Sequence, residues 1–195
     1  MHAYRNTREE KRAYYDQLKF ISREQVAASF KRRLQLEGNI ELWDKTLLSS
    51  INEKALKEAA TIWPLNSHKS PYNKSFGEGW YEFYKQYFYC PSFFDLAIWQ
   101  TVDGVDVLQG LCLGRPSRKK EHLRIFRLEK NWADNRMKGG INAPVLACAE
   151  RYAQMLECKR VVVKKGLDST FESIYGYEPY DLHGGYGEFI SKELM

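Results

Sequence analysis

The chain has 195 residues, 44% of them apolar and 28% charged, and a formal net charge of +5. This composition is typical of a globular protein with one domain, or one domain and a helical extension, and it excludes disorder as the default state. Because no run of about eighteen apolar residues occurs, we expect no membrane span. The polar N-terminal segment lacks the apolar stretch of a secretory signal and predicts a cytoplasmic protein.

Residues 1–90 are predicted to form a helical N-terminal extension that packs on the rest of the chain. Apolar residues recur at helical spacing over 7–36, and a second helix is expected over 52–62. The aromatic run 80–89 also has helical spacing, which favours rings that pack in a core or at an interface.

Residues 91–195 are predicted to form the core of the fold, because the patterns change there from helices to strands. Apolar runs predict strands at 93–100, 105–113, 123–128, 160–163, 176–179 and 187–192. Asp103-Gly104 predicts a hairpin turn, and helices are expected over 143–157 and 168–175. This order indicates an α+β fold with a central mixed, mostly antiparallel sheet and flanking helices.

A glycine pair, Gly139-Gly140, lies between the third predicted strand and the amphipathic helix. Backbone N–H groups at a helix start have no intrahelical partner and, with the helix dipole, they can bind a phosphate. Arg136 and Lys138 add positive charge to the same loop. Segment 135–142 is therefore a candidate anion site, and a simple turn is the alternative.

Positive charge is concentrated in two clusters, Arg115–Lys120 and Lys31–Arg33. Either cluster suits a nucleic acid or an anionic cofactor. The alternatives are a solvated hairpin tip for the first cluster and a solvated helix face for the second.

Four cysteines and four histidines are scattered without the spacing of metal ligands. The cysteines are Cys90, Cys112, Cys148 and Cys158. We expect reduced structural thiols and no metal site.

Two segments carry a family resemblance. The segment Arg136-Met-Lys-Gly139-Gly140-Ile141-Asn142 opens a helix, and Phe171-Glu-Ser-Ile-Tyr-Gly176-Tyr177 follows after one more strand. In this order, over roughly 93–194, the sequence resembles the GCN5-related N-acetyltransferase superfamily. In that family a strand leads into an Arg/Gln-x-x-Gly-x-Gly/Ala loop whose backbone amides bind the pyrophosphate of acyl-CoA. Here Ile141 or Asn142, depending on the frame, stands where the family has a small residue.

The resemblance implies an acyl-CoA-dependent N-acyltransferase that uses acetyl-CoA as cosubstrate and acts on an amine of unidentified class. The cofactor-binding residues that it implies are Leu128, Arg136, Met137, Lys138, Gly139, Gly140, Ile141, Asn142 and Phe171. Backbone at Leu128 would hold the pantetheine arm, and the loop would hold the pyrophosphate.

For catalysis, Glu129 at the end of the third strand is the first candidate for the general base, acting directly or through water. The alternative is a solvated charge paired with Lys130, and Asp134 is a second candidate base. The family commonly has a proton-donating Tyr four residues before the Gly, where this chain has Glu172. Tyr175 is the candidate acid instead, and a packed tyrosine is its alternative.

Two further functions stay open. In a nucleic-acid-modifying protein of the same fold, the two basic clusters would engage phosphates and the rings of 80–89 would stack on bases. A non-catalytic module would keep the fold as a binding surface. A homodimer is compatible with any of these functions.

Overall fold

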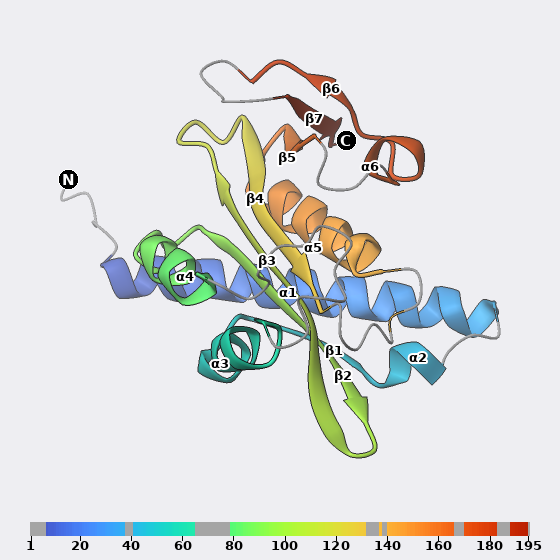
Figure 1. The fold of residues 1–195 in the computed structure, drawn as a ribbon. Helices are drawn as coiled ribbons and strands as arrows, with labels where there is room; N and C mark the ends of the chain where they lie inside the picture. The colour runs from blue at the N-terminus through green and yellow to red at the C-terminus, as the bar shows by residue number, and fades with distance from the viewer. Residues whose placement is uncertain are drawn as a thin grey trace.

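The computed structural model describes residues 7–37, 41–64, 79–131, 137, 140–165, 170–182 and 188–194. These residues form a seven-stranded sheet of order β1-β2-β3-β4-β5-β7-β6, with helices on both faces (Figure 1). Neighbouring strands are antiparallel except β4 and β5, which are parallel. The predicted α+β class with a mixed, mostly antiparallel sheet is confirmed.

The strands are β1 (Thr46–Ser49), β2 (Phe94–Val102), β3 (Val105–Pro116), β4 (His122–Lys130), β5 (Arg160–Lys164), β6 (Glu178–Tyr180) and β7 (Phe189–Glu193). The helices are α1 (Arg8–Leu36), α2 (Glu41–Asp44), α3 (Glu53–Thr61), α4 (Trp80–Phe88), α5 (Asn142–Met155) and α6 (Thr170–Ser173). None of these described helices is long and apolar enough to cross a membrane.

Helix α1 begins at a capping box. The Thr7 hydroxyl accepts the Glu10 N–H at 3.2 Å, and the Glu10 carboxylate accepts the Thr7 N–H at 2.6 Å. The helix then runs beside α5 on one face of the sheet (Figure 1). The predicted helix over 7–36 is confirmed.

Two hydrophobic cores lie on the two faces of the sheet. Strand β2 contributes side chains to both cores, because successive residues of a strand point to opposite faces of the sheet. The core under α1 and α5 includes Val26, Leu96, Ile98, Ile125, Val145, Ala149 and Tyr152. The core under α3 and α4 includes Ala55, Leu56, Ala59, Trp80, Ala97, Trp99 and Leu111.

Strand β1 was not predicted from the sequence. It is an edge strand that pairs antiparallel with β2, with Leu47 opposite Trp99. The Trp99 indole N–H donates to the Ser49 hydroxyl at 3.1 Å across this pair. Leu47 is 55% exposed, so the strand lacks the continuous apolar pattern of a buried strand. Its pairing partner lies some fifty residues further along the chain, which a local pattern does not reveal.

The β2–β3 hairpin turns at Asp103 and Gly104, as predicted. Both residues have positive φ angles, 50° and 78°. Positive φ at both central positions matches the backbone twist of a two-residue hairpin.

A buried ion pair joins α1 to the sheet. Lys19 and Asp95 are 2% and 1% exposed, and Lys19 Nζ lies 2.7 Å from Asp95 Oδ1. Asp95 Oδ2 also accepts the Ile51 N–H at 2.8 Å, which fixes the turn between β1 and α3. The ammonium lies 4.4 Å from the centre of the Phe93 ring and 2.8 Å from the half-exposed carboxylate of Asp16.

We expect Asp95→Asn to lower the free energy of unfolding by about 3 kcal/mol, because it removes the buried charge opposite the Lys19 ammonium. Asp106→Asn removes the same charge from an exposed pair with Lys54, whose atoms lie 3.7 Å apart. That control should change stability by less than about 1 kcal/mol. Urea unfolding followed by circular dichroism compares the two variants, and equal effects would contradict this role for Asp95.

The four thiols differ in burial. Cys112, Cys148 and Cys158 are buried, and Cys90 is half-buried with its Sγ 3.6 Å from the Ser92 hydroxyl. Burial raises the pKa of Cys148 to about 12 and that of Cys158 to about 11, and it raises the pKa of Cys112 well above its usual range. A raised pKa keeps these thiols protonated at pH 8, where the thiolate is the reactive form.

We therefore expect Cys90 to react first with a chromogenic disulfide reagent at pH 8, and the other three thiols to react on unfolding. Cys90→Ser should remove the fast phase from the absorbance trace. Rapid reaction of three or more thiols in the folded chain would contradict the burial of these side chains.

Candidate functional site

The pairing of β4 with β5 ends part of the way along β4, one residue before β5 itself ends at Lys164. Their parallel register runs from His122, opposite Arg160, to Ile125, opposite Val163. At that point β4 has an extra residue, Phe126, because its register with β3 shifts between Leu113 and Gly114. A bulge bends a strand and increases its twist. In the described pairing, 126–130 of β4 continue beside β3 but not beside β5.

Gly114 allows the close approach of β3 and β4 at this bulge. A Cβ atom at that position would lie 2.9 Å from the backbone oxygen of Arg124. Such a contact is shorter than real Cβ atoms make, so a larger residue would require the backbone to shift. The absence of a side chain on Gly114 therefore helps to keep the bulge where it is.

The loop after β4 is anchored at its start by Asn131, which is 2% exposed. The Asn131 backbone N–H donates to the Gln109 carbonyl at 2.8 Å, and its side-chain amide donates to the Leu108 carbonyl at 2.9 Å. Both acceptors belong to β3, so the loop leaves the sheet at a fixed point. Asn131 was not predicted as a site residue from the sequence, because its role depends on a partner strand.

The end of this loop forms a tight turn. The Gly140 N–H donates to the Met137 carbonyl at 2.8 Å, and Gly140 has a φ of 84°. This left-handed conformation favours glycine, which has no Cβ to clash with its own backbone. Arg136, Lys138 and Gly139 of the predicted loop lie outside the described residues.

Ile141 and Met137 have their side chains in the core, where they are 3% and 4% exposed. A Cβ on Gly110 of β3 would lie 2.5 Å from Ile141 Cδ1, so the isoleucine fills the space above a residue without a side chain. Ile141, which is larger than the residues usual in the glycine motif, thus has a packing role. Any contact of these two residues with a ligand would come from their backbone atoms.

Helix α5 starts beside Gly140 without a side-chain cap. Ile141 is its N-cap residue and makes no capping hydrogen bond through its side chain, and Pro144 in the first turn has no N–H. Asn142, the first residue of the helix, follows directly. The positive end of the helix dipole and a left-handed glycine turn therefore occur together, an arrangement that suits a phosphate.

The Glu129 carboxylate is held on the opposite face of β4 from α5. Its Oε2 accepts the Trp80 indole N–H at 2.6 Å and lies 3.2 Å from a guanidinium nitrogen of Arg127. The Glu129 side chain is 9% exposed. The Arg127 guanidinium lies 4.7 Å from the centre of the Trp80 ring and 4.4 Å from that of Phe83. Trp80 and Arg127 thus orient Glu129 in a small polar cluster. The carboxylate is largely buried there and is not a solvated charge at the end of the strand.

Trp80 and Arg127 were not identified as site residues from the sequence. Arg127 and Glu129 are two residues apart on one strand, which places them on the same face, and this spacing was an available signal. Trp80 is 49 residues away on α4 and gives no such signal. Leu128, between the two charged residues, packs against the core on the α5 face.

The aromatic residues of the C-terminal motif, Phe171–Tyr177, pack against one another around α6. Phe171 is fully buried, and its ring centre lies 6.2 Å from that of Tyr175 and 6.0 Å from that of Tyr177. The Tyr177 hydroxyl donates to Glu150 at 3.3 Å, and desolvation followed by this carboxylate raises the pKa of Tyr177. Tyr175 is half-buried, so it has more access to solvent than Tyr177.

We looked for side chains that could bind a metal ion in the part of the chain that the structure describes. No group of three or more His, Cys, Asp or Glu side chains is arranged there to hold an ion.

Comparison with known proteins gives a match at the level of structure. No protein-family model matches the sequence, and no curated protein matches it. A Staphylococcus aureus acetyltransferase of the GNAT family is similar in structure, with a TM-score of 0.56 at 10% identity over 77% of this chain and 99% of that chain. A Salmonella typhimurium protein determined with its cofactor acetyl-CoA has a TM-score of 0.51 at 10% identity over 77% and 95%.

A third solved structure is part of a longer protein. N-acetylglutamate synthase from Neisseria gonorrhoeae, complexed with coenzyme A and N-acetylglutamate, has a TM-score of 0.53 at 15% identity. The match covers 77% of this chain and 35% of that one. These likenesses agree with the family resemblance that the two sequence motifs carry. The chain has the fold of the GCN5-related N-acetyltransferases.

Proposed function

We propose that this protein transfers an acetyl group from acetyl-CoA to an amine. The observation that carries the proposal is a stretch of β4 without a β5 neighbour in the described pairing, together with the Gly140 turn and a start of α5 that has no side-chain cap. This stretch of β4 offers backbone groups, and the turn with the helix start offers an anion site. The Salmonella protein of the same fold holds acetyl-CoA, and the Neisseria protein holds coenzyme A.

In this proposal the pyrophosphate of acetyl-CoA binds beside the Gly140 turn, at the backbone of Ile141 and Asn142. Arg136, Met137, Lys138 and Gly139 complete the loop. Backbone groups at Leu128, in the second half of β4, suit the amides of the pantetheine arm. Phe171 supports the site from the core rather than from its surface, since its ring is fully buried.

The chemistry needs a base and a proton donor. Acetyl-CoA supplies an activated thioester carbonyl: the amine nitrogen bonds to this carbon, and the carbon–sulfur bond breaks. Glu129 takes the proton that the amine loses, through a water molecule because its carboxylate is largely buried. Trp80 and Arg127 orient that carboxylate. The departing thiolate takes a proton from Tyr175 or from solvent.

The first test is thermal stabilisation by the cosubstrate. Acetyl-CoA at about 100 times its dissociation constant should stabilise the folded chain by about 2.7 kcal/mol, since it binds the native state. No shift in Tm at about 1 mM acetyl-CoA would overturn the proposal. The expected shift is read by differential scanning calorimetry.

A matched pair of glycine variants locates the binding site. Gly140 and Gly104 have φ angles of 84° and 78°, and a Cβ would meet no atom closer than 3.9 Å at the first and none within 4 Å at the second. Alanine in this conformation costs about 1 kcal/mol at either place. Only Gly140→Ala should also weaken acetyl-CoA binding, by about tenfold, because it alters the turn at the anion site.

The second test concerns the base. Glu129→Gln should reduce the turnover number by about 100-fold or more, because the amide cannot accept the proton. Glu121→Gln is the control, since Glu121 lies at the far end of β4 and pairs with Lys159 at 2.9 Å. Release of coenzyme A from acetyl-CoA is measured with a panel of polyamines, aminoglycosides and peptide N-termini. Unchanged turnover in Glu129→Gln would remove this residue from the base role.

A further inference from the structure

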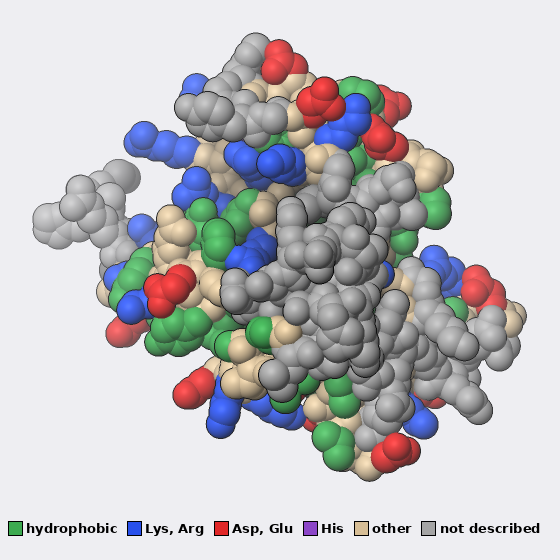
Figure 2. Space-filling model, viewed as in Figure 1, with side chains coloured by type: hydrophobic (Ala, Val, Ile, Leu, Met, Phe, Trp, Pro, Cys, Tyr) green, Lys and Arg blue, Asp and Glu red, His purple; other side chains and the backbone are tan. Residues whose placement is uncertain are grey.

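The end of the sheet remote from the proposed acetyl-CoA site carries uncompensated positive charge. Lys and Arg side chains gather over the part of the surface where the β3–β4 hairpin lies (Figure 2). This hairpin precedes His122, the first residue of β4, whereas the glycine loop follows Lys130, the last. At about 3.3 Å per residue, the two ends of the strand lie roughly 25–30 Å apart. The basic hairpin tip therefore lies apart from the glycine loop, and the hollows beside it extend along β4 as far as Phe126.

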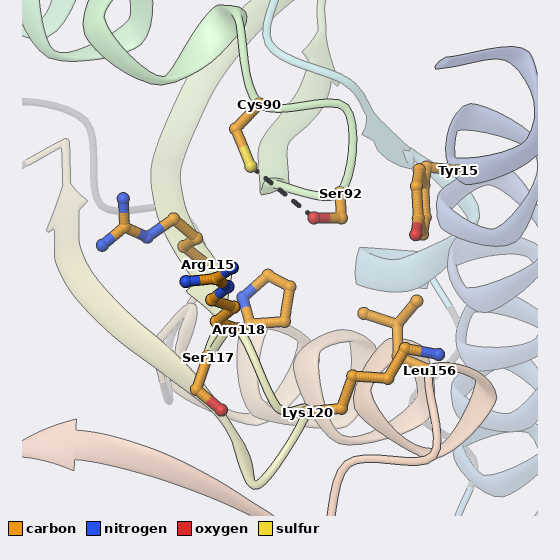
Figure 3. A pocket seen from close by; sticks show the side chains of 9 residues that line it. Tyr15, Cys90, Ser92, Arg115, Ser117, Arg118, Lys120 and Leu156 are labelled. Atoms are coloured by element: carbon orange, nitrogen blue, oxygen red, sulfur yellow. Dashed lines mark hydrogen bonds between the residues drawn. The ribbon is translucent and has the colours of Figure 1, made fainter. Parts of the chain in front are cut away.

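Two hollows of about 420 and 400 Å³ flank the hairpin. They share Arg115 and Arg118, and the first is also lined by Tyr15, Ser92 and Lys120 (Figure 3). In the close view, side chains from α1, from the segment before β2 and from the hairpin surround one space. The hairpin thus presents the same two arginines to a hollow on each side.

No acidic residue appears among the described residues that line either hollow. Arg115, Arg118, Lys120 and Arg124 also have no carboxylate partner in the described part of the chain, and Arg124 Nε is buried without a hydrogen-bond partner. Clustered charges of one sign repel each other, and an anion relieves that repulsion. Burial and then the charges of Arg124 and Arg160 lower the pKa of His122, which also lines the second hollow.

In the other basic cluster of the sequence, Lys31 and Arg33 have carboxylate partners. Lys31 Nζ lies 2.9 Å from Asp44, and Arg33 Nε lies 3.9 Å from Glu37. Both pairs are on the exposed face at the end of α1. The two clusters look equivalent in the sequence, but Lys31 and Arg33 have carboxylate partners, whereas Arg115, Arg118 and Lys120 have none among the described residues. The acidic residue nearest to the hairpin cluster in sequence, Glu121, pairs with Lys159.

Aromatic rings lie beside the hairpin arginines. Tyr87 and Phe126 line the second hollow with their ring centres 4.3 Å apart, and the Arg115 guanidinium lies 5.6 Å from the Tyr87 ring centre. Further along α4, Phe88 and Tyr89 are 38% and 63% exposed. Rings that alternate with cations are the combination that binds single-stranded nucleic acids, through stacked bases and neutralised phosphates.

We propose that the hairpin hollows bind a single-stranded nucleic acid. Its phosphates lie at Arg115, Arg118 and Lys120, and a base stacks at Tyr87. A linked chain of phosphates fits two hollows that share their arginines. The aromatic faces require unpaired bases, which a duplex does not offer. This binding is independent of acetyl transfer.

The test is fluorescence anisotropy of the full chain with a labelled 15-nucleotide uridine RNA. The double variant Arg115→Gln/Arg118→Gln should weaken binding at least tenfold and reduce the slope of log K against log salt concentration by about 1.4. The double variant Lys31→Gln/Arg33→Gln removes the same net charge and should change affinity less than twofold. Circular dichroism checks that both variants are folded.

A third variant tests stacking. Tyr87→Leu keeps an apolar side chain and should weaken binding by about fivefold or more. Equal losses in the two double variants, an unchanged affinity in Tyr87→Leu, equal affinity for an RNA duplex of the same length, or no binding at low salt would each overturn the proposal. None of these results bears on acetyl-CoA binding, so the two proposals fail separately.

Discussion

The buried ion pair between Lys19 and Asp95 sets the position of α1, on which the rest of the arrangement depends. Both side chains are almost fully excluded from solvent, and Asp95 also accepts the backbone N–H of Ile51. A buried charge is tolerated only when its partners are in place, so the pair admits one placement of helix and sheet. Helix α1 in turn packs beside α5, whose start forms one side of the proposed acetyl-CoA site.

Strand β4 connects the two sites that we propose. Its first half pairs with β5 as far as Ile125, and after the bulge at Phe126 its second half continues beside β3 in the described pairing. The hairpin with the basic hollows precedes the first half, and the glycine loop follows the second half. Because roughly 25–30 Å separates the ends, and charges beyond about 10 Å are screened in physiological salt, each site can bind its own anion.

The fold is kept at 10% to 15% identity to its structural neighbours because many side chains can satisfy the same packing. Ile141 shows how this works at one position. In one of the two frames in which the loop resembles the family motif, Ile141 stands where the family has a small residue, and Gly110 on β3 provides the space for its side chain. The substitution is therefore accommodated by packing, with the turn at Gly140 left in its left-handed conformation.

The sequence by itself determined the local elements: α1, the β2–β3 hairpin, the glycine turn before α5 and the short helix at Phe171. Periodicity and turn residues act within a few positions, so they can be read from a single chain. Tertiary structure alone decided that Thr46–Ser49 is a strand and that Trp80 holds Glu129 from 49 residues away. It also decided that Lys31 and Arg33 have carboxylate partners, whereas the hairpin arginines have none in the part of the chain that is described. These features depend on which groups, far apart in the sequence, come into contact and are desolvated in the folded chain. A local sequence pattern contains no information about such contacts.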